Sequence, residues 1–506
     1  MVIQYQNSSH IMRELLEQYD LPIVTQELES NNEIQSEKHL KPIADSIVKI
    51  IEERSSGVQD LAVFGSAENP YEIGYETVIP SFQKSLIENH DFRVLIGGPN
   101  CKKPYSASVY NVSALSFGPI GKKFILSVNQ AAKEQGFYQN TGEAGISPYH
   151  FGDDIDIEAS GFDIDEYFNR KHCEEYSAGD LVWEIGSGYY GCCTVQGKFD
   201  ESLYRLKAAL PSIKMIEIKL SQGLEPSKRL PVKRLTPGIA KVLGVSPSSI
   251  VALPTSHREF SNPVELLKFV ERLRILSGCK PIGIKLSVGN KRQFMSLCKA
   301  MLVTKIVPDF LTIDGMEAGT SGSSRSVTGF MGSTLDESLV FANNILIGCG
   351  LRKHLKIIAS GRVFSERDIV SKMARGADIC ATARSILIAT GCDQQLECYK
   401  GTCNKGIATQ DPKLLSNFDC EKATRRVRNF HEMTMQGLSE ILSVMGLIST
   451  NGISMKHVQK RISVTETRML SELYQNIPEG SLNSYINWRI PSSIRQDWKT
   501  AKHNQF

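Results

Sequence analysis

The chain has 506 residues, of which 41% are hydrophobic and 22% are charged, and its formal net charge is +3. This composition predicts a globular protein with one large domain and appendages, or with two or three domains. Twelve cysteines are too few for a disulfide scaffold of this length, and no long run of one charge sign points to nucleic acid. The sequence has neither a run of 18 apolar residues nor the apolar core of a signal peptide, so we expect no membrane span and a cytoplasmic protein.

Residues 1–95 predict helices separated by polar loops. The segment HLKPIADSIVKIIEER (39–54) carries one apolar face at helical spacing. That face consists of Ile43, Ile47, Val48, Ile50 and Ile51. We therefore expect an N-terminal helical region ahead of a differently organised domain.

Eight short apolar runs follow from about residue 96, and helical patterns separate most of them. The runs span residues 111–118, 136–143, 180–188, 214–223, 281–289, 309–315, 356–362 and 378–384. Two intervening helices are marked by PVELLKFVERLRILSG (263–278) and SERDIVSKMARGAD (365–378). Nearly continuous apolar strands that alternate with helices predict a parallel sheet covered on both faces. Eight repeats favour an α/β fold with a closed (β/α)8 barrel over residues 96–412, and a doubly wound open sheet is the alternative.

Polar and charged residues stand at the C-terminal ends of these runs. They are Ser116, Glu143, Glu184, Lys285, Asp314, Arg362 and Arg384. In closed parallel barrels this rim is where active sites form. The simpler explanation, that strand ends are polar because loops are, accounts for any one of them but fits less well with so many charged residues.

Two long interruptions divide the repeats. Residues 144–179 form a strongly acidic insertion between the second and third strands, and residues 221–262 are rich in proline and serine. Both are candidate lids or partner surfaces. After residue 412 the pattern becomes helical again, which predicts a C-terminal helical extension over residues 413–506.

The last two predicted strands end in a phosphate-binding pattern. ASGR (359–362) and TARS (382–385) each precede a predicted helix. Backbone N–H groups at a helix start attract phosphate, and Arg362 and Arg384 would add charge-assisted hydrogen bonds. The alternative is two ordinary strand-to-helix turns. A further glycine-rich turn, IDGMEAGTSGSS (313–324), could lie against a flat ring or a small anion, or could be a mobile loop only.

Lys285 ends the apolar run PIGIK. A lysine in a barrel mouth is costly unless it pairs with negative charge. An anionic reduced flavin would be one such partner. The alternative is a structural ion pair with Glu184, Glu217 or Asp314.

Three cysteines, Cys392, Cys398 and Cys403, lie within 12 residues in the segment GCDQQLECYKGTC. Thiolates favour iron–sulfur clusters or zinc, and three close ligands suit a three-iron cluster. Three buried thiols without a metal are the alternative. Together with a phosphate site and a cationic strand end, the cysteines suggest flavin and iron–sulfur electron transfer.

Residues 101–420 resemble the FMN-binding synthase domain of glutamate synthases, and most closely the stand-alone FMN-binding glutamate synthase family proteins. The resemblance rests on GGPNCKKPYSASVYNVSALSFG, QNTGEAG, DLVWEIGSGYYGC, MIEIKLSQG, LTPGIAKVLGV, IGIKL, TIDGMEAGTSG, ASGR and the three cysteines followed by GIATQDP. It implies a TIM barrel that binds FMN, and a [3Fe-4S] cluster on Cys392, Cys398 and Cys403. It also implies hydride delivery from reduced flavin to 2-iminoglutarate, which forms from 2-oxoglutarate and ammonia.

The resemblance also implies roles for single residues. Lys285 would stabilise the reduced flavin and contact substrate, and Glu143 would orient substrate or ammonia. Residues implied in FMN binding are Ser116, Gly118, Glu184, Lys285, Asp314, Gly315, Gly361, Arg362, Ala383 and Arg384. Of these, Gly361, Arg362, Ala383 and Arg384 would hold the phosphate.

The sequence departs from the family pattern at several points. Ala144 stands in place of a glycine, Asn404 in place of a proline, and Glu184 in place of a glutamine that would face the flavin. We expect neither a glutaminase domain nor an NAD(P)H-binding module. Electrons would therefore come from a ferredoxin or a separate reductase subunit, and ammonia from solvent or a partner. The alternatives are N-methylglutamate synthase-type group transfer and a non-catalytic scaffold that keeps the barrel.

Overall fold

The computed structural model describes residues 43–58, 68–172, 178–221, 235–246, 254–319, 329–483 and 490–506. Residues Pro42–Phe506 form one compact unit. The helix expected at 39–54 is present as α2 (Asp45–Ser55). The extended backbone of Ala44, with φ −60° and ψ 145°, sets its start.

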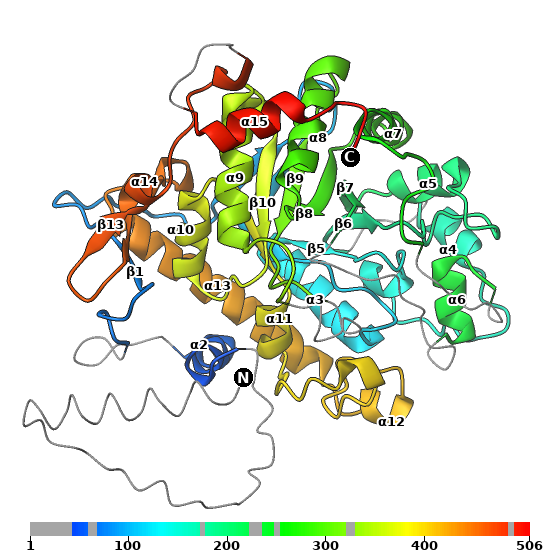
Figure 1. Cartoon of the computed structure of the whole chain (residues 1–506). Helices are drawn as coiled ribbons and strands as arrows, with labels where there is room; N and C mark the ends of the chain where they lie inside the picture. The colour runs from blue at the N-terminus through cyan, green and yellow to red at the C-terminus, as the bar shows by residue number, and fades with distance from the viewer. Residues whose placement is uncertain are drawn as a thin grey trace, which may run out of the picture. The chain divides into compact units, whose positions relative to one another are not determined.

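Eight parallel strands form a closed barrel at the centre of this unit (Figure 1). They are β4 (Tyr110–Val112), β5 (Tyr138–Asn140), β6 (Asp180–Ile185), β7 (Ile213–Lys219), β8 (Ile282–Ser287), β9 (Phe310–Asp314), β10 (Lys356–Ser360) and β11 (Ile379–Thr382). The last strand returns to the first, with Cys380 opposite Tyr110. The predicted barrel is therefore confirmed, and the open sheet is excluded because β11 pairs with β4.

Helices follow most of the strands and cover the outside of the barrel. They include α3 (Lys122–Gln135), α5 (Glu201–Ala208), α7 (Pro263–Leu276), α8 (Lys291–Thr304), α9 (Leu335–Gly348), α10 (Glu366–Ala374) and α11 (Arg384–Ala389). Both clearly marked helices are confirmed. Helix α7 starts where the Asn262 side chain accepts a hydrogen bond from the Glu265 N–H, and α10 starts at Ser365 in a reciprocal capping box with Asp368.

The acidic insertion folds against its neighbours. It contains the short helix η1 (Pro148–Phe151) and α4 (Ile164–Lys171), and Glu158 accepts hydrogen bonds from α6 (Pro237–Leu243) and its cap, Thr236. Asp153 pairs with Lys171 at 2.7 Å and Asp154 with Lys122 at 2.6 Å. These three acidic side chains are therefore engaged by donors of the insertion and of neighbouring elements, and a role as a lid or a partner surface stays a prediction. Residues 173–177, 222–234 and 247–253 of the two interruptions lie outside the described residues.

The two terminal regions contain strands as well as the expected helices. β1 (Glu76–Val78) joins β12 (Val458–Arg461) and β13 (Thr467–Met469) in an antiparallel sheet, and β2 (Arg93–Ile96) pairs with β3 (Tyr105–Ser108). The expectation of helices alone is wrong here, because strands of three or four residues are too short to leave a clear alternating pattern, and β1 pairs with β12, which lies far along the chain. The boundaries predicted at residues 96 and 412 stay predictions.

The remaining helices include α12 (Pro412–Leu415), α13 (Cys420–Val444), α14 (Leu470–Leu473) and α15 (Ser492–Thr500). The long helix α13, orange in Figure 1, packs on α2 and α3. Its His431 ring stacks on Tyr110 of β4 at 6.1 Å between centroids. Of the helices in the described ranges, none combines the length and apolar character that crossing a membrane requires.

Candidate functional site

A buried lysine lies among carboxylates at the C-terminal end of the barrel. Lys285 of β8 is 1% exposed, and its Nζ lies 2.9 Å from Glu184 Oε2 and 3.7 Å from Asp314 Oδ2. Glu184 belongs to β6 and Asp314 ends β9, so three strands converge on one ammonium group. The ion pair that was the alternative for Lys285 is thus present. The carboxylate of Glu184, which departs from the family pattern, faces the Lys285 ammonium group.

A fourth buried group, Glu217 of β7, lies opposite Glu184 in the strand register. Its Oε1 accepts a hydrogen bond from Asn140 Nδ2 at 2.9 Å, and its Oε2 accepts one from the Thr312 hydroxyl. Both glutamates are almost completely buried, Glu184 at 1% and Glu217 at 2% exposure. One ammonium group therefore faces three carboxyl groups in a space closed to water.

Burial and Lys285 shift the pKa values of these acids in two opposite directions. Burial opposes ionisation of Glu184, but Lys285 and Lys219 outweigh it and hold the pKa of Glu184 below its usual value. Burial, only partly offset by Lys285, raises the pKa of Glu217 to about 8 and raises that of Asp314. The same acids raise the pKa of Lys285 despite its burial. The directions of these pKa shifts favour the ionised forms of Glu184 and Lys285 and the protonated form of Glu217.

A second ion pair joins the C-terminal ends of β5 and β7. Lys219 Nζ, at the end of β7, lies 2.7 Å from Glu143 Oε1 in the loop after β5. The backbone carbonyl of Lys219 contacts the buried His257 ring at Nε2, 2.8 Å away. Glu143, predicted as a substrate-orienting residue, therefore stands beside a cation that could bind an anionic substrate with it.

The two predicted phosphate turns are neighbours in space. β10 and β11 pair in parallel, and the Gly361 N–H donates to the Ala381 carbonyl at 3.2 Å. Gly361 has φ +115°, and apart from its chain neighbours no described residue has an atom within 4 Å of the position that a Cβ would take there. Arg362 and Arg384 are exposed beside these turns, and Ala383 is half-buried. The structure thus brings these four residues to adjacent strand ends with free space above Gly361.

The remaining predicted ring contacts lie on neighbouring loops. A Cβ added at Gly142, next to Glu143, would lie 2.7 Å from the Ser116 backbone N, so these two loops touch. The Gln410 side chain donates to the Gly118 carbonyl at 2.8 Å. Gly315 follows Asp314, and the next turn is held by Glu317, which accepts from the Leu335 N–H at 3.1 Å. Residues 320–324 of the glycine-rich turn lie outside the described residues.

The family model described as "Conserved region in glutamate synthase" matches residues 80–448, a segment that contains all eight barrel strands. The chain belongs to the glutamate synthase family. The glutamate synthase large subunit-like protein YerD of Bacillus subtilis is 31% identical over 370 residues, which are 72% of this chain and 66% of that protein. The archaeal-type glutamate synthase [NADPH] of Thermotoga neapolitana is 25% identical over 338 residues, 66% of this chain and 59% of that protein. The chain thus matches less than two thirds of the length of these relatives.

Solved structures give a weaker comparison for this glutamate synthase-family chain. A doubly substituted variant of flavocytochrome b2 with sulfite bound has a TM-score of 0.44 and 11% identity, and the match covers 88% of this chain and 85% of that one. A likeness of this size supports no argument about ligand or function.

The cysteine loop of this family member is anchored at both sides. Gln394 exchanges two hydrogen bonds with the backbone of Ile43, at 3.1 and 3.2 Å, and Gln410 after the loop reaches Gly118. Burial, together with the nearby thiols of Cys398 and Cys403, raises the pKa of Cys392 to about 11. The Cys398 and Cys403 thiols thus affect the pKa of Cys392 electrostatically. Among the described residues, no group of three or more His, Cys, Asp or Glu side chains has the arrangement of a metal site.

Several residues of the site carry no sequence signal of their own. Asn140 and Thr312 are neutral residues inside apolar strands, and His257 lies in an irregular segment. Lys219 had a signal, because it stands near the end of the fourth apolar run, and the strand-end argument would have found it. The two departures Ala144 and Asn404 lie in the loop after β5 and in the cysteine loop.

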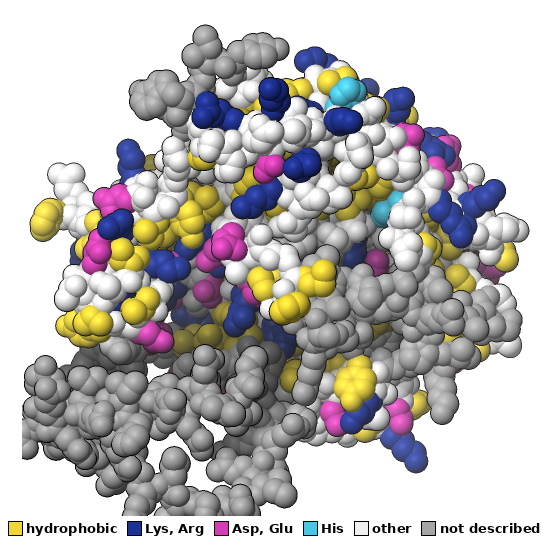
Figure 2. All heavy atoms as spheres, in the orientation of Figure 1, with side chains coloured by type: hydrophobic (Ala, Val, Ile, Leu, Met, Phe, Trp, Pro, Cys, Tyr) yellow, Lys and Arg dark blue, Asp and Glu magenta, His cyan; other side chains and the backbone are white. Residues whose placement is uncertain are grey.

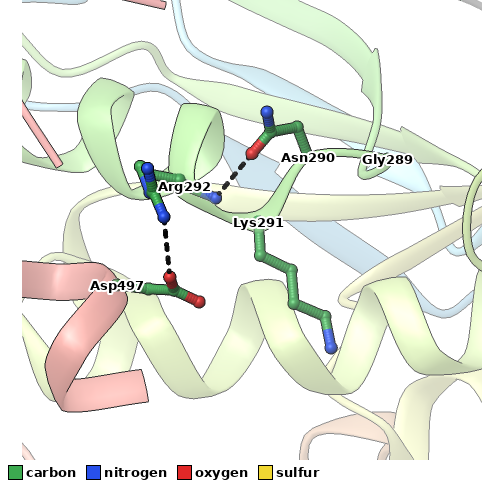
Figure 3. Close-up of a pocket in the computed structure, with 5 residues that line it drawn as sticks. All are labelled: Gly289, Asn290, Lys291, Arg292 and Asp497. Carbon is green, nitrogen blue, oxygen red and sulfur yellow. Dashed lines mark hydrogen bonds and ion pairs between the residues drawn. The ribbon is translucent and has the colours of Figure 1, made fainter. Parts of the chain in front are cut away.

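A surface cavity of about 530 Å³ opens just after β8, at the start of α8 (Figure 3). It is lined by Gly289, Asn290, Lys291, Arg292 and Asp497. The Asn290 side chain already accepts the Arg292 N–H, and Arg292 reaches Asp497 of α15 at 3.5 Å. The Arg292 N–H and the Arg292 guanidinium group thus already have partners within the protein. We therefore assign no second site to this cavity, which lies beside the C-terminal end of the barrel. Figure 2 shows that Lys and Arg side chains are scattered over this face of the molecule among acidic and apolar ones.

Proposed function

We propose that this protein is an FMN-dependent oxidoreductase that makes L-glutamate from 2-oxoglutarate and ammonia. Ammonia condenses with the 2-oxo group to give 2-iminoglutarate and water, and the C=N bond then takes up a hydride and a proton. The observation that carries the proposal is the family match, which spans every strand of the barrel. The archaeal-type relatives are glutamate synthases by name, and YerD is named for its likeness to a glutamate synthase large subunit.

The residues at the barrel mouth fit FMN. The open space over Gly361 and the exposed Arg362 and Arg384 suit a phosphate. Asp314 Oδ2 is buried and has no hydrogen-bond partner among the described residues, so this end of the site has a polar atom to offer to a ligand. Bound FMN would supply the two-electron reduction of the C=N bond.

The chain's own residues would bind and orient the reactants. The Lys285 ammonium would neutralise an anionic ligand edge, because its burial strengthens that attraction. Lys219 would bind a substrate carboxylate, and Glu143 would orient ammonia or the imine nitrogen within hydrogen-bonding reach. Glu184 would keep Lys285 in place through their 2.9 Å contact.

We further propose that Cys392, Cys398 and Cys403 hold a [3Fe-4S] cluster that passes electrons inward. The support is the chemistry of three thiolates in one loop and the hydrogen bond from Gln410 to Gly118, which ties this loop to the predicted flavin edge. A ferredoxin or a separate reductase subunit in the cytoplasm would supply the electrons, and solvent or a partner would supply ammonia.

The experiment is glutamate formation by the purified protein with a chemical reductant, 2-oxoglutarate and ammonium under anaerobic conditions. We expect L-glutamate, and we expect FMN to be released from the protein on heating. N-methylglutamate formed preferentially when methylamine replaces ammonium would favour the group-transfer alternative instead. A colourless protein that binds neither FMN nor iron after anaerobic reconstitution would support the scaffold alternative and contradict the proposal.

A further inference from the structure

A buried asparagine joins the inside of the barrel to the turn that carries Glu143. Asn140 is the last residue of β5 and is 5% exposed. Its Nδ2 donates to Glu217 Oε1 at 2.9 Å, and its Oδ1 accepts the Gly142 N–H at 2.9 Å. Both ends of this amide are therefore engaged, one with a side chain of β7 and the other with the backbone that leads into Glu143.

Glu217 can anchor this contact because other strands hold it in place. It lies within β7, is 2% exposed, and its Oε2 accepts from the Thr312 hydroxyl of β9. The two accepted hydrogen bonds favour the carboxylate of Glu217, whereas burial raises its pKa. An unprotonated Oε1 accepts from Asn140 in the carboxylate, and equally when a proton is held on Oε2.

The turn after β5 is also fixed on its other sides. The Thr141 N–H donates to a carbonyl of β6 at 3.0 Å, and its hydroxyl accepts the Glu184 N–H at 3.2 Å. Gly142 has φ +66°, and a Cβ added there would lie 2.7 Å from the Ser116 backbone N. The path of the backbone into the next residue is thus set by β6, by the Ser116 loop and by the side chain of Asn140.

Strand β7 contacts this turn at two points. Glu143 follows Gly142 directly, and its Oε1 lies 2.7 Å from Lys219 Nζ. Glu217 and Lys219 are two residues apart in β7, so their side chains leave the same face of the strand. The strand therefore reaches the turn directly through Lys219, and indirectly through Glu217 and Asn140.

We propose that Asn140 and, through it, Glu217 are positioning residues that set the place of the Glu143 carboxylate. The consequence for catalysis rests on the proposed function, in which Glu143 would orient ammonia or the imine nitrogen. Misplacing such a group by about 1 Å can lower a rate about 100-fold. The loss should appear mainly in the kinetics of ammonium, because Lys219 would bind the carboxylate of 2-oxoglutarate.

The test reverses the direction of the hydrogen bond between the two residues. Asn140→Asp keeps an acceptor for the Gly142 N–H and removes the donor to Glu217. Glu217→Gln keeps an acceptor for Asn140, because an amide oxygen can take the place of Oε1. In the double variant the introduced amide can donate to the introduced carboxylate, so the contact returns with donor and acceptor exchanged.

Asn129→Asp is the matched control, because Asn129 makes the same pair of contacts outside the site. It lies on α3 and is 1% exposed. Its Oδ1 accepts the Gly179 N–H at 3.0 Å, and its Nδ2 donates to Gln139 Oε1 at 3.2 Å. Gly179 precedes β6, so these contacts lie at the end of the barrel opposite to the mouth.

Two measurements compare these variants in the full-length protein. The first is amide hydrogen exchange of the peptide that contains Gly142, followed by mass spectrometry without substrates. The second is kcat and KM for ammonium and for 2-oxoglutarate in the FMN-loaded enzyme. In Asn140→Asp we expect faster exchange and a fall in kcat/KM for ammonium of about tenfold or more, with little change in KM for 2-oxoglutarate.

Glu217→Gln alone should stay close to the unsubstituted protein, and the double variant should regain most of what Asn140→Asp loses. Asn129→Asp should change neither the exchange of this peptide nor the kinetics of ammonium. A double variant that is no better than Asn140→Asp would overturn the proposal. If Asn140→Asp does not fold, Glu217→Met, which removes the acceptor, is compared with Glu217→Gln, and equal exchange and kinetics in these two would overturn it.

The exchange measurement needs no turnover, so the two proposals can fail separately. Absence of glutamate formation in the unsubstituted protein would contradict the proposed function, and the exchange of the Gly142 peptide would still decide the role of Asn140. Glutamate formation together with unchanged exchange and unchanged ammonium kinetics in Asn140→Asp would contradict the positioning role and leave the proposed function standing.

Discussion

At the scale of single residues, Lys285 is the central charged group of the barrel mouth. Its ammonium group is almost completely buried and reaches two carboxylates from two different strands. Replacing it by an apolar residue would leave those carboxylates without a cation in a space that water does not enter. Breaking a buried pair in this way is among the costlier single substitutions, because charge remains buried and unpaired.

We therefore predict that Lys285→Met lowers the free energy of unfolding by about 3 kcal/mol and weakens FMN binding. Adding Glu184→Gln should restore part of the stability but not the FMN affinity, because it removes the unpaired carboxylate without returning the cation. Urea denaturation and FMN titration measure the two effects. Lys49→Met on the exposed face of α2 is the control. Equal stability of Lys285→Met and the control would contradict the ion-pair account.

At the scale of elements, the turn after β10 combines an unusual backbone with free space. Gly361 has φ +115°, a conformation that residues with a Cβ rarely adopt, and an added Cβ there would meet no atom of the described residues beyond its chain neighbours. The space is open in the protein, and in our account the phosphate of FMN takes it.

Gly361→Ala should thus lower FMN affinity at least about tenfold, an effect of about 1.4 kcal/mol. Gly350→Ala is a matched control, because Gly350 also has a positive φ of +78° and equally open surroundings but lies after α9, away from the predicted phosphate turns. Both variants carry the backbone strain, and only the first places a methyl group in the predicted phosphate site. Equal FMN affinity of the two variants, measured by fluorescence titration, would place the phosphate elsewhere.

The cysteine loop is the second element that can be tested alone. We predict that Cys398→Ala abolishes the EPR signal of the oxidised cluster while the far-ultraviolet circular dichroism of the barrel is unchanged, because the loop lies outside the eight strands. Cys420→Ala, in the first turn of α13, is the control for loss of a thiol outside the loop. An unchanged signal in Cys398→Ala would refute the assignment of this ligand.

The elements that could be predicted from the sequence are those whose signal is local. Most barrel strands lie in short, largely apolar runs, and Lys285, Glu184 and Asp314 were found because they end such runs. Asn140 and Thr312 could not be found, since neutral residues inside a strand gain a role only from the register that places them beside Glu217. The sheet formed by β1 and β12 also escaped prediction, because Thr77 meets Gln459 only in the folded chain.

At the scale of the whole molecule, the two terminal regions are tied to each other and to the barrel. Glu76 of β1 pairs with Arg375, the C-terminal cap of α10, and with Lys460 of β12 at 3.5 Å. Arg375 is completely buried, and its guanidinium group also lies 3.5 Å from Asp336. One carboxylate, that of Glu76, thus links segments from the start, the middle and the end of the described chain.

For this reason Arg375→Met should destabilise the protein by about 3 kcal/mol, as expected for a broken buried pair. Arg367→Met on the same helix is the comparison, because Arg367 is 63% exposed and its 2.8 Å contact with Glu68 is a surface pair worth about 1 kcal/mol or less. Chemical denaturation monitored by tryptophan fluorescence gives both values. Similar midpoints for the two variants would show that the terminal regions are not held through Arg375.

The central claim is that the barrel reduces an imine formed from 2-oxoglutarate and ammonia, and flavin reoxidation tests it most directly. The FMN-loaded protein is reduced anaerobically and mixed with 2-oxoglutarate, with ammonium, or with both, while the flavin absorbance is followed. The account predicts rapid reoxidation only with both compounds, together with one L-glutamate formed for each flavin reoxidised. Flavin that stays reduced with both compounds, but is reoxidised by a different oxo or imino acid, would contradict it.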